Sequence, residues 1–489
     1  MRIVFALNVA ITSLTFAPLA WADAKDDLVI ACDKLAASPE DATRPKGISG
    51  LKISEIDGDA AVKACQAAQN AIPDNARVAF EFARALSAAK ADPSLIFSLT
   101  LNAANMGHLV AMNNVGAALN YGKGTVKNEA EATKWFQKAA TAPSPPRIAL
   151  YNYGWQLTHG LGTPVDLAAG NDYICRAAEA GYVPAMASCG SALYFGQGLK
   201  QNLVTAVKWF QAGADAGDSL SQYNLGVAYD HGEGVARDYA KAVQYYQLAA
   251  DQGYPSAWLN LGLLYEFGRG VSADTKRAFE LYRKAAEQNI PEAQANLGDM
   301  YRKGQGVAQD YAQALSWYQK AADQNFSRAI TELGLLYDSG LGVAKDETKA
   351  ALLYEKSAGL GDVDGMNNLA VDMLSGTGRP KDVKAGVALL EKAVAAGGAR
   401  AAYNLAGHYD RGDIVERNTE KSASLYLKAI AGKNPDAVQF LITEKAAKLS
   451  AETADAIQKQ LISRGQKFEV LKGKLAPEAI AALAALAKG

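Results

Sequence analysis

Few residues in this sequence have both the type and the spacing that covalent chemistry requires. Ser87 and Lys90 have the S-x-x-K spacing in which a lysine can activate a serine nucleophile, but neither S-D-N nor K-T-G follows. The segment from Gly116 to Lys123 resembles a phosphate-binding loop, but five residues instead of four separate its glycines, and Gly124 stands where Ser or Thr should bind Mg²⁺. We therefore expect no catalytic residue, and we place Ser87 at a helix end.

The histidines and cysteines give no metal-binding pattern. The four histidines are His108, His159, His231 and His408, and their spacing does not match that of metal ligands. The motifs H-E-x-x-H, C-x-x-C and G-x-S-x-G do not occur in the sequence. We predict no metal and no cofactor, and we expect the histidines on the surface or in loops.

The first residues have the pattern of an export signal. A short positive start, Met1-Arg2, precedes a mostly apolar run, and Ala20-Trp21-Ala22 then gives a small-residue cleavage site. We interpret residues 1–22 as a secretory signal peptide, which predicts a periplasmic or secreted protein. The alternative is a buried N-terminal helix. No later segment reaches the ~18–20 apolar residues that a membrane span needs, so no span is expected after cleavage.

Export changes the interpretation of the four cysteines, because thiols tend to pair in an oxidising compartment. Four cysteines allow three connectivities. We favour Cys32–Cys65 and Cys175–Cys189, because each of these pairs is local in the sequence. Buried free thiols are the alternative.

The composition excludes two further classes of protein. Of the 489 residues, 49% are apolar and 21% are charged, with a formal net charge of −1. This apolar content is enough for a large core and is not that of a disordered chain. The near-zero net charge argues against a broad basic surface, so we expect no nucleic acid as a partner.

The elements that carry all these residues come from an internal repeat. Alignment on one small residue, called the marker here, shows one spacing of 38 residues followed by seven spacings of 36. The markers are Gly116, Gly154, Gly190, Gly226, Gly262, Gly298, Gly334, Ala370 and Ala406. A fixed period of this size is the signature of a solenoid.

Each column of the repeat has a physical role. Residues five before and sixteen after the marker are small, which marks where the two helices of a unit cross closely. Large residues spaced by three and four then define a first helix, helix A, and an aromatic-rich second helix, helix B.

A G-x-G loop separates the two helices, and its first Gly can end helix A with a positive φ. The glycines that we regard as structural are Gly226, Gly232, Gly234, Gly262, Gly268, Gly270, Gly298, Gly304 and Gly306. Twelve residues after the marker, Asp or Asn fills all nine places, where a side-chain acceptor can cap helix B. These residues are Asn128, Asp166, Asn202, Asp238, Asp274, Asp310, Asp346, Asp382 and Asn418.

A single helix pair of this kind cannot bury its own apolar face, whereas stacked pairs can. The sequence therefore predicts an all-α fold: a right-handed α-solenoid of about nine 36-residue helix-loop-helix repeats with helical caps at both ends. No β-structure is needed.

The repeat resembles a known family. The segment YNLGVAYDHGEGVARDYAKAVQYYQLAADQGYPSA and its copies are similar to the Sel-one-like repeat (SLR), a relative of the tetratricopeptide repeat. The resemblance covers residues 108–432. It weakens late, where Ala370 and Ala406 replace the marker Gly and Ile414 replaces the second loop Gly, so we expect an altered last loop.

The flanks divide into three parts. Residues 23–72 do not fit the period and are predicted to be an N-terminal cap held by the Cys32–Cys65 disulfide. Residues 73–107 have the pattern of a degenerate repeat, with Ala83 at the marker position. Residues 433–489 follow the last repeat and are predicted to be a C-terminal helical cap or a degenerate peptidoglycan-binding-like module.

The last prediction rests on a weak resemblance to the small helical peptidoglycan-binding module. The matching residues are Gln458, Leu461, Gly465, Gly473, Leu475 and Pro477. The segment departs from the module at Lys472, Ala476 and Ala479, where Asp, Gly and Thr are usual. An amphipathic C-terminal cap is the alternative.

One polar column could bind a partner. Two residues before the marker stand Asn114, Asn152, Asn224, Asn260, Asn296, Asn368 and Asn404, and Ser188 and Glu332 break the series. The resemblance to the tetratricopeptide fold implies that helix A lines a concave groove where such Asn residues hold a peptide backbone. The alternative is that these Asn residues bridge successive helices A.

Together these features predict an exported scaffold or adaptor that binds another protein or a peptide segment on the solenoid surface, with regulation of that partner as one use. The alternative is a peptidoglycan-associated envelope protein. A β-lactam hydrolase is the least favoured alternative, because no coherent nucleophile site is present.

Overall fold

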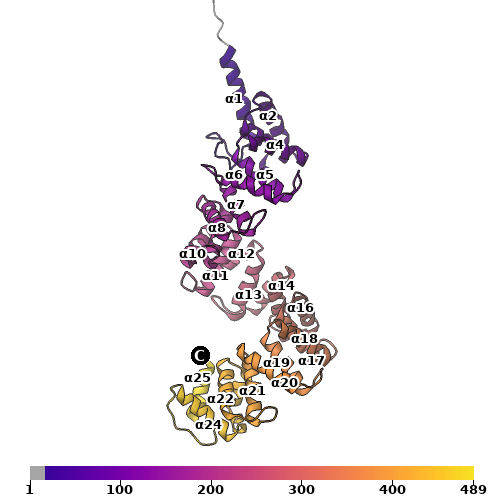
Figure 1. The fold of residues 1–489 in the computed structure, drawn as a ribbon, viewed down its shortest axis with the longest axis vertical. Helices are drawn as coiled ribbons and strands as arrows, with labels where there is room; N and C mark the ends of the chain where they lie inside the picture. The colour runs from indigo at the N-terminus through magenta and orange to yellow at the C-terminus, as the bar shows by residue number, and fades with distance from the viewer. Residues whose placement is uncertain (1–16, 489) are drawn as a thin grey trace, which may run out of the picture. The chain divides into compact units, whose positions relative to one another are not determined.

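The computed structural model describes residues 17–488, and every regular element in this range is helical (Figure 1). The predicted all-α fold is therefore confirmed for this part of the chain. Most of the predicted signal peptide lies outside the described residues, and only its last six residues fall within α1 (Ala17–Ala36).

None of the helices in residues 17–488 has both the length and the apolar character that a membrane span requires.

The chain forms two compact units, Met1–Gln252 and Gly253–Gly489. The described helices of the first unit are α1, η1 (Ile53–Glu55), α2 (Gly58–Ala71), α3 (Ala76–Ala88), α4 (Pro93–Asn105), α5 (Leu109–Tyr121), α6 (Glu129–Ala140), α7 (Arg147–His159), α8 (Leu167–Glu179), α9 (Val183–Phe195), α10 (Leu203–Asp215), α11 (Ser219–His231) and α12 (Tyr239–Asp251). Those of the second unit are α13 (Pro255–Phe267), α14 (Thr275–Glu287), α15 (Pro291–Lys303), α16 (Tyr311–Asp323), α17 (Ser327–Ser339), α18 (Glu347–Gly359), α19 (Val363–Ser375), α20 (Val383–Ala395), α21 (Ala399–Arg411), α22 (Thr419–Ala431), α23 (Pro435–Ile442), η2 (Glu444–Lys448), α24 (Ala451–Ser463) and α25 (Pro477–Lys488).

Within each unit, successive helices of the repeats pack side by side (Figure 1). The odd-numbered helices α5 to α21 are helices A, and the even-numbered helices α6 to α22 are helices B. The two small-residue columns are buried where the helices cross, as Ala293 and Ala314 show with no exposed surface. Each hairpin thus buries apolar surface against its neighbours, which is how a solenoid is stabilised.

Local sequence sets the limits of each helix. In the third repeat of the second unit, Gly340 adopts the left-handed conformation at φ 67° and ends α17. The Asp346 side chain accepts a hydrogen bond from the Lys349 backbone N–H at 2.9 Å and caps α18. All nine Asp and Asn residues of this column accept from a backbone N–H of helix B, so the predicted caps are confirmed.

The second loop glycine has a role that the sequence did not indicate. A Cβ on Gly306, which has φ 72°, would collide with the carbonyl of Thr275 at the start of the preceding helix B. This glycine therefore lets the loop of one repeat pack against the previous repeat. In the last repeat Gly412 still ends α21 at φ 68°, and Ile414, which lacks a positive φ, packs against the core instead.

Both predicted disulfides are confirmed. Cys32 in α1 bonds Cys65 in α2, with 4.6 Å between their Cα atoms. Cys175 in α8 bonds Cys189 in α9, with 5.0 Å between their Cα atoms. The second bridge joins a helix B to the helix A of the next repeat and therefore links two repeats covalently.

The loop between α1 and η1 attaches the N-terminal helices to the first repeats. Asp41 contacts His108 at 3.2 Å, and His108 caps α5 by accepting from the Ala111 backbone N–H at 3.1 Å. The Arg147 guanidinium forms a bidentate pair with Glu40 at 2.8 and 2.9 Å. His108 lies in the loop before α5, as expected, but it is buried, with only 6% of its surface exposed.

After α22 the 36-residue period ends, and α24 and α25 pack against α22. The buried Gln458 amide organises the loop between α24 and α25. Its Nε2 donates to the Leu471 and Lys474 carbonyls at 3.0 Å, and its Oε1 accepts from the Leu471 and Ala476 N–H groups at 3.0 and 3.1 Å. Gln458, one of the residues that match the peptidoglycan-binding module, thus holds this loop in place.

Candidate partner-binding surface

The Asn column lies on helices A, and all seven Asn side chains are half-buried. Each helix A begins and ends at the same places of its repeat, so these side chains recur at one level of the successive helices. The contacts of the column differ between its members.

In the first unit, the column connects neighbouring helices A. Asn152 Nδ2 in α7 donates to Asn113 Oδ1 in α5 at 2.8 Å. Asn113 Nδ2 in turn donates to Asn114 Oδ1 at 3.2 Å. Asn224 Nδ2 in α11 reaches Ser191 Oγ in α9 at 3.4 Å. These contacts match the alternative in which the Asn residues bridge successive helices A.

The second unit has similar bridges and adds charged groups. Asn404 Nδ2 in α21 donates to Asn367 Oδ1 in α19 at 2.8 Å, and Asn367 Nδ2 donates to Asn368 Oδ1 at 3.2 Å. Arg328 in α17 donates to Asn296 Oδ1 at 2.6 Å and to an Asp299 carboxylate oxygen at 2.8 Å, both in α15.

In one member of the column, a donor is both buried and without a partner among residues 17–488. Asn368 Nδ2 is buried and has no hydrogen-bond partner in the described part of the chain. A buried amide donor without a partner costs about 1–3 kcal/mol, which a ligand acceptor could recover. This unpartnered donor distinguishes Asn368 from the members of the column that bridge helices A.

Asn368 lies at a charged cleft formed by helices A of the second unit. The cleft has a volume of about 210 Å³. Its lining residues are Arg302, Arg328, Thr331, Glu332, Leu335, Asp362, Asp364, Asn368 and Arg400. Arg400 and Asp364 are exposed, and neither has an ion-pair or hydrogen-bond partner among the side chains that the structure describes.

The charged side chains inside this cleft lie close enough to affect one another. Burial and the nearby Asp299 charge raise the pKa of Glu332, although Arg302 and Arg328 oppose this change. Arg302 lies 3.6 Å from a Glu332 carboxylate oxygen and 3.5 Å from an Asp299 carboxylate oxygen. The cleft thus combines fixed charges inside with two unpaired charges at its edge, an arrangement suited to a polar, charged ligand.

The other candidate residues do not form a catalytic site. Ser87 lies in the last turn of α3, as expected at a helix end, and its hydroxyl forms no hydrogen bond with the Lys90 side chain among residues 17–488. Gly116 lies within α5 against the Phe136 ring, so it belongs to no phosphate-binding loop. No group of three potential metal ligands occurs among the described side chains.

The charged cleft was missed in the sequence, although a signal was present. Six residues before the marker, four successive repeats carry Glu292, Arg328, Asp364 and Arg400. This alternation of charge occurs on the same helix face as the Asn column. Reading the two columns together would have indicated a charged surface.

Comparison with known proteins agrees with the repeat pattern. The model of the Sel1 repeat matches nine consecutive segments: residues 109–144, 147–182, 183–218, 219–254, 255–290, 291–326, 327–362, 363–398 and 399–434. No curated protein matches the chain.

Solved structures include similar proteins. The protective antigen c5321 of uropathogenic Escherichia coli, which displays an SLR fold, has 27% sequence identity and a TM-score of 0.69, with 90% of this chain and 91% of that chain covered. A Sel1 repeat protein from Oxalobacter formigenes has 34% identity and a TM-score of 0.48, covering 50% of this chain and 96% of its own. With nine matched repeats in an α-solenoid, the chain belongs to the Sel1 repeat family.

Proposed function

We propose that this chain is an exported adaptor that binds another protein on the helix A surface of its second unit. Proteins built from Sel1 repeats are protein-interaction scaffolds. The described residues hold no assembled catalytic group, so a binding role is favoured over an enzymatic one. The charged cleft is the part of the surface with the most specific chemistry.

The observation that carries this proposal is the unused Asn368 donor beside the unpaired charges of Asp364 and Arg400. An extended peptide presents backbone carbonyls that an amide can bind and charged side chains that the edge can pair. The Asn column also bridges helices A, so binding and bridging are divided among its members. Asn368 belongs to the first group, and Asn152 and Asn404 belong to the second.

Export is supported by two features. Both disulfides join cysteines that are local in the sequence, and disulfides persist mainly in oxidising compartments. The pattern of residues 1–22 is that of a secretory signal peptide. We propose that residues 23–72 are the N-terminal cap and that residues 73–107, which contain α3 and α4, are a degenerate repeat.

A charge reversal at the edge of the cleft tests the proposed surface. Arg400→Glu changes an exposed charge of α21, and Lys384→Glu makes the same change on the exposed side of α20, which does not line the cleft. After capture from the native cells, we expect the partner to be at least tenfold less abundant with Arg400→Glu and unchanged with Lys384→Glu. Equal recovery with both variants would exclude the cleft as the binding surface.

A second candidate function is attachment to peptidoglycan through residues 464–476. The Gln458 amide fixes this loop, and Val470 and Leu471 on it are 38% and 39% exposed. Val470→Asp should prevent cosedimentation with purified sacculi if the loop binds the polymer. Val126→Asp, at an exposed valine of the first repeat, is the control. If the wild-type chain stays in the supernatant, the C-terminal segment is only a cap.

A further inference from the structure

A cavity in the first unit has the features of a ligand site. It has a volume of about 260 Å³ and lies between α3, α4 and α5. Its apolar wall is formed by Ile53, Phe80, Ala83, Pro93, Ile96, Phe97, Ala117 and Ala118. Ligand sites combine such apolar walls with a few polar groups that fix orientation.

The polar groups of this cavity are mainly donors. Arg84, Ser87, Asn114 and Lys123 line it, and no acidic residue does so in the described chain. Lys123 Nζ, Ser87 Oγ and Asn114 Nδ2 form no hydrogen bond with any group of residues 17–488, although Asn114 Oδ1 accepts from Asn113. The site therefore presents a positive charge and unused donors, which together select for an anion.

Arg84 supplies a second positive charge, and this charge is buried. Its side chain donates to the Ala36 carbonyl at 2.9 Å and to the Leu51 carbonyl, and no carboxylate lies within ion-pair distance. Arg84 is 9% exposed. A buried charge without a counter-ion is costly, so an anion near this guanidinium would be stabilised.

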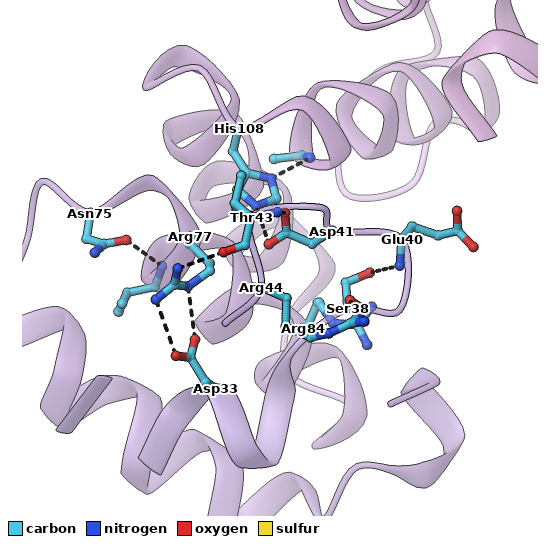
Figure 2. A network of polar contacts seen from close by, with 12 residues as sticks. Asp33, Ser38, Glu40, Asp41, Thr43, Arg44, Asn75, Arg77, Arg84 and His108 are labelled. Atoms are coloured by element: carbon cyan, nitrogen blue, oxygen red, sulfur yellow. Dashed lines mark hydrogen bonds and ion pairs between the residues drawn. The ribbon is translucent and has the colours of Figure 1, made fainter. Parts of the chain in front are cut away.

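The acids around Arg84 are used elsewhere or are uncharged. Asp33 pairs with Arg77 at 3.0 and 3.2 Å, and Asp41 pairs with His108 (Figure 2). Burial and the Asp33 charge raise the pKa of Glu81 far above its usual range, so this carboxyl stays neutral. No carboxylate in residues 17–488 therefore forms a direct ion pair with Arg84.

We infer that this cavity binds an apolar group that ends in a carboxylate. The carboxylate interacts with Arg84 and Lys123, and the apolar part packs against Phe80, Ile96 and Phe97. Arg84 Nε and Nη2 already donate to carbonyls, so its Nη1 group supplies the charge-assisted hydrogen bond to the carboxylate. The carboxylate can come from the C-terminal residue of a peptide or from a free fatty acid. This inference does not depend on partner binding at the cleft of the second unit.

Calorimetric titration of the full chain tests the inference with four probes. Decanoate and a hexapeptide ending in Leu carry the carboxylate, and decanamide and the amidated hexapeptide are their neutral counterparts. We expect binding of at least one carboxylate probe and at least tenfold weaker binding of its neutral counterpart. Binding of decanoate alone would identify a free acid as the ligand, and binding of the hexapeptide alone would identify a peptide C-terminus. Binding of both would show that the site recognises the carboxylate and apolar group that the two probes share.

Variants connect the binding to this cavity. Lys123→Gln and Ala118→Phe, which fills the cavity, should each weaken binding at least tenfold, whereas Lys134→Gln, at an exposed position of α6 outside the cavity, should not. Arg84→Gln should abolish binding, and a melting curve shows whether that variant folds. If it does not fold, Lys123→Gln and Ala118→Phe decide. No binding of either carboxylate, equal binding of the neutral probes, or unchanged binding by both deciding variants would overturn the inference.

Discussion

The ring of Tyr282 in α14 lies directly against the backbone of Gly262 in α13. A Cβ at residue 262 would come within 2.7 Å of the ring carbon Cε1. Tyr282 has no exposed surface, and its hydroxyl donates to a Glu266 carboxylate oxygen at 2.7 Å. Residue 262 is therefore glycine because an aromatic ring twenty residues later occupies the space of a side chain.

This relationship predicts the effect of Gly262→Ala. The added methyl forces apart a rigid, buried pair, which costs about 1–3 kcal/mol and outweighs the gain of up to ~1 kcal/mol in helix propensity. In the last repeat Ala406 coexists with Tyr426, so the pair can partly relax, and the cost before the propensity gain should be about 2 kcal/mol rather than the upper end of this range. Urea denaturation should therefore show a loss of about 1 kcal/mol in the free energy of unfolding.

Gly359→Ala is the matched control, because a Cβ there meets no atom within 4 Å. It should leave stability unchanged or increase it slightly. The double variant Gly262→Ala/Tyr282→Leu reproduces the pairing of Ala370 with Leu390 in this chain, and it should show a favourable coupling energy. Equal stability of Gly262→Ala and Gly359→Ala would contradict the packing argument.

The helix B caps predict a small, uniform stability effect. Asp274 Oδ1 accepts from the Arg277 backbone N–H at 2.9 Å. Asp274→Ala leaves that N–H without its partner and should cost about 1 kcal/mol in the free energy of unfolding, whereas Asp274→Asn preserves most of the cap. If thermal melting shows the same loss for both variants, the side-chain cap does not explain this column.

Glu81 predicts an unusual dependence of stability on pH. Its carboxyl is fully buried, and neither oxygen has a hydrogen-bond partner in the described residues. Burial, Asp33 and Asp41 raise its pKa, and Arg77 opposes them. The folded state then holds a proton that the unfolded state loses above pH about 4.5, so this group lowers stability as pH rises.

Glu81→Gln removes the titrating carboxyl, so the melting temperature should change less between pH 5 and pH 8 than it does in the wild-type chain. The stabilising effect of the substitution should grow toward pH 8. Asp41, whose pKa is lowered to about 2 by its contacts with His108 and Thr43 despite its burial, acts below this window. An identical pH dependence of the wild-type chain and Glu81→Gln would show that Glu81 is ionised in the folded protein.

The two classes of Asn residues predict opposite consequences of truncation. Asn404→Ala removes the bond to Asn367 between α21 and α19 and should lower the free energy of unfolding by about 1 kcal/mol. Asn368→Ala removes the hydrogen bond from Asn367 Nδ2, but it removes an unpaired buried donor as well. Because the two effects oppose each other, its net effect on stability should be near zero. Partner binding should be weakened by Asn368→Ala. If Asn368→Ala lowers stability and leaves partner binding unchanged, the whole column serves only to bridge helices A.

The sequence predicted those features whose cause is local. The helix B caps lie within three residues of the N–H groups that donate to them, and the Cys175–Cys189 bridge spans fourteen residues. The role of Gly262 was not predicted, because it depends on a ring in another helix. The pairing of His108 with Asp41 was missed for the same reason, since 67 residues separate them.

The binding surfaces were the least predictable part. The charged cleft combines Arg302, Glu332, Asp364 and Arg400 from four helices A, so no single repeat contains it. The cavity beside Arg84 depends on the exact packing of α3 against α4 and α5. Repeats specify a common backbone, whereas each surface depends on side chains that differ between repeats.

Site-specific crosslinking tests the central claim that the helix A surface of the second unit binds a protein. A photoreactive residue at Asp364, on the edge of the cleft, is compared with one at Lys392, on the exposed side of helix B α20. In the native cells, we predict one defined adduct from position 364 and none from position 392. Adducts of equal yield from both positions, or an adduct only from position 392, would contradict the account.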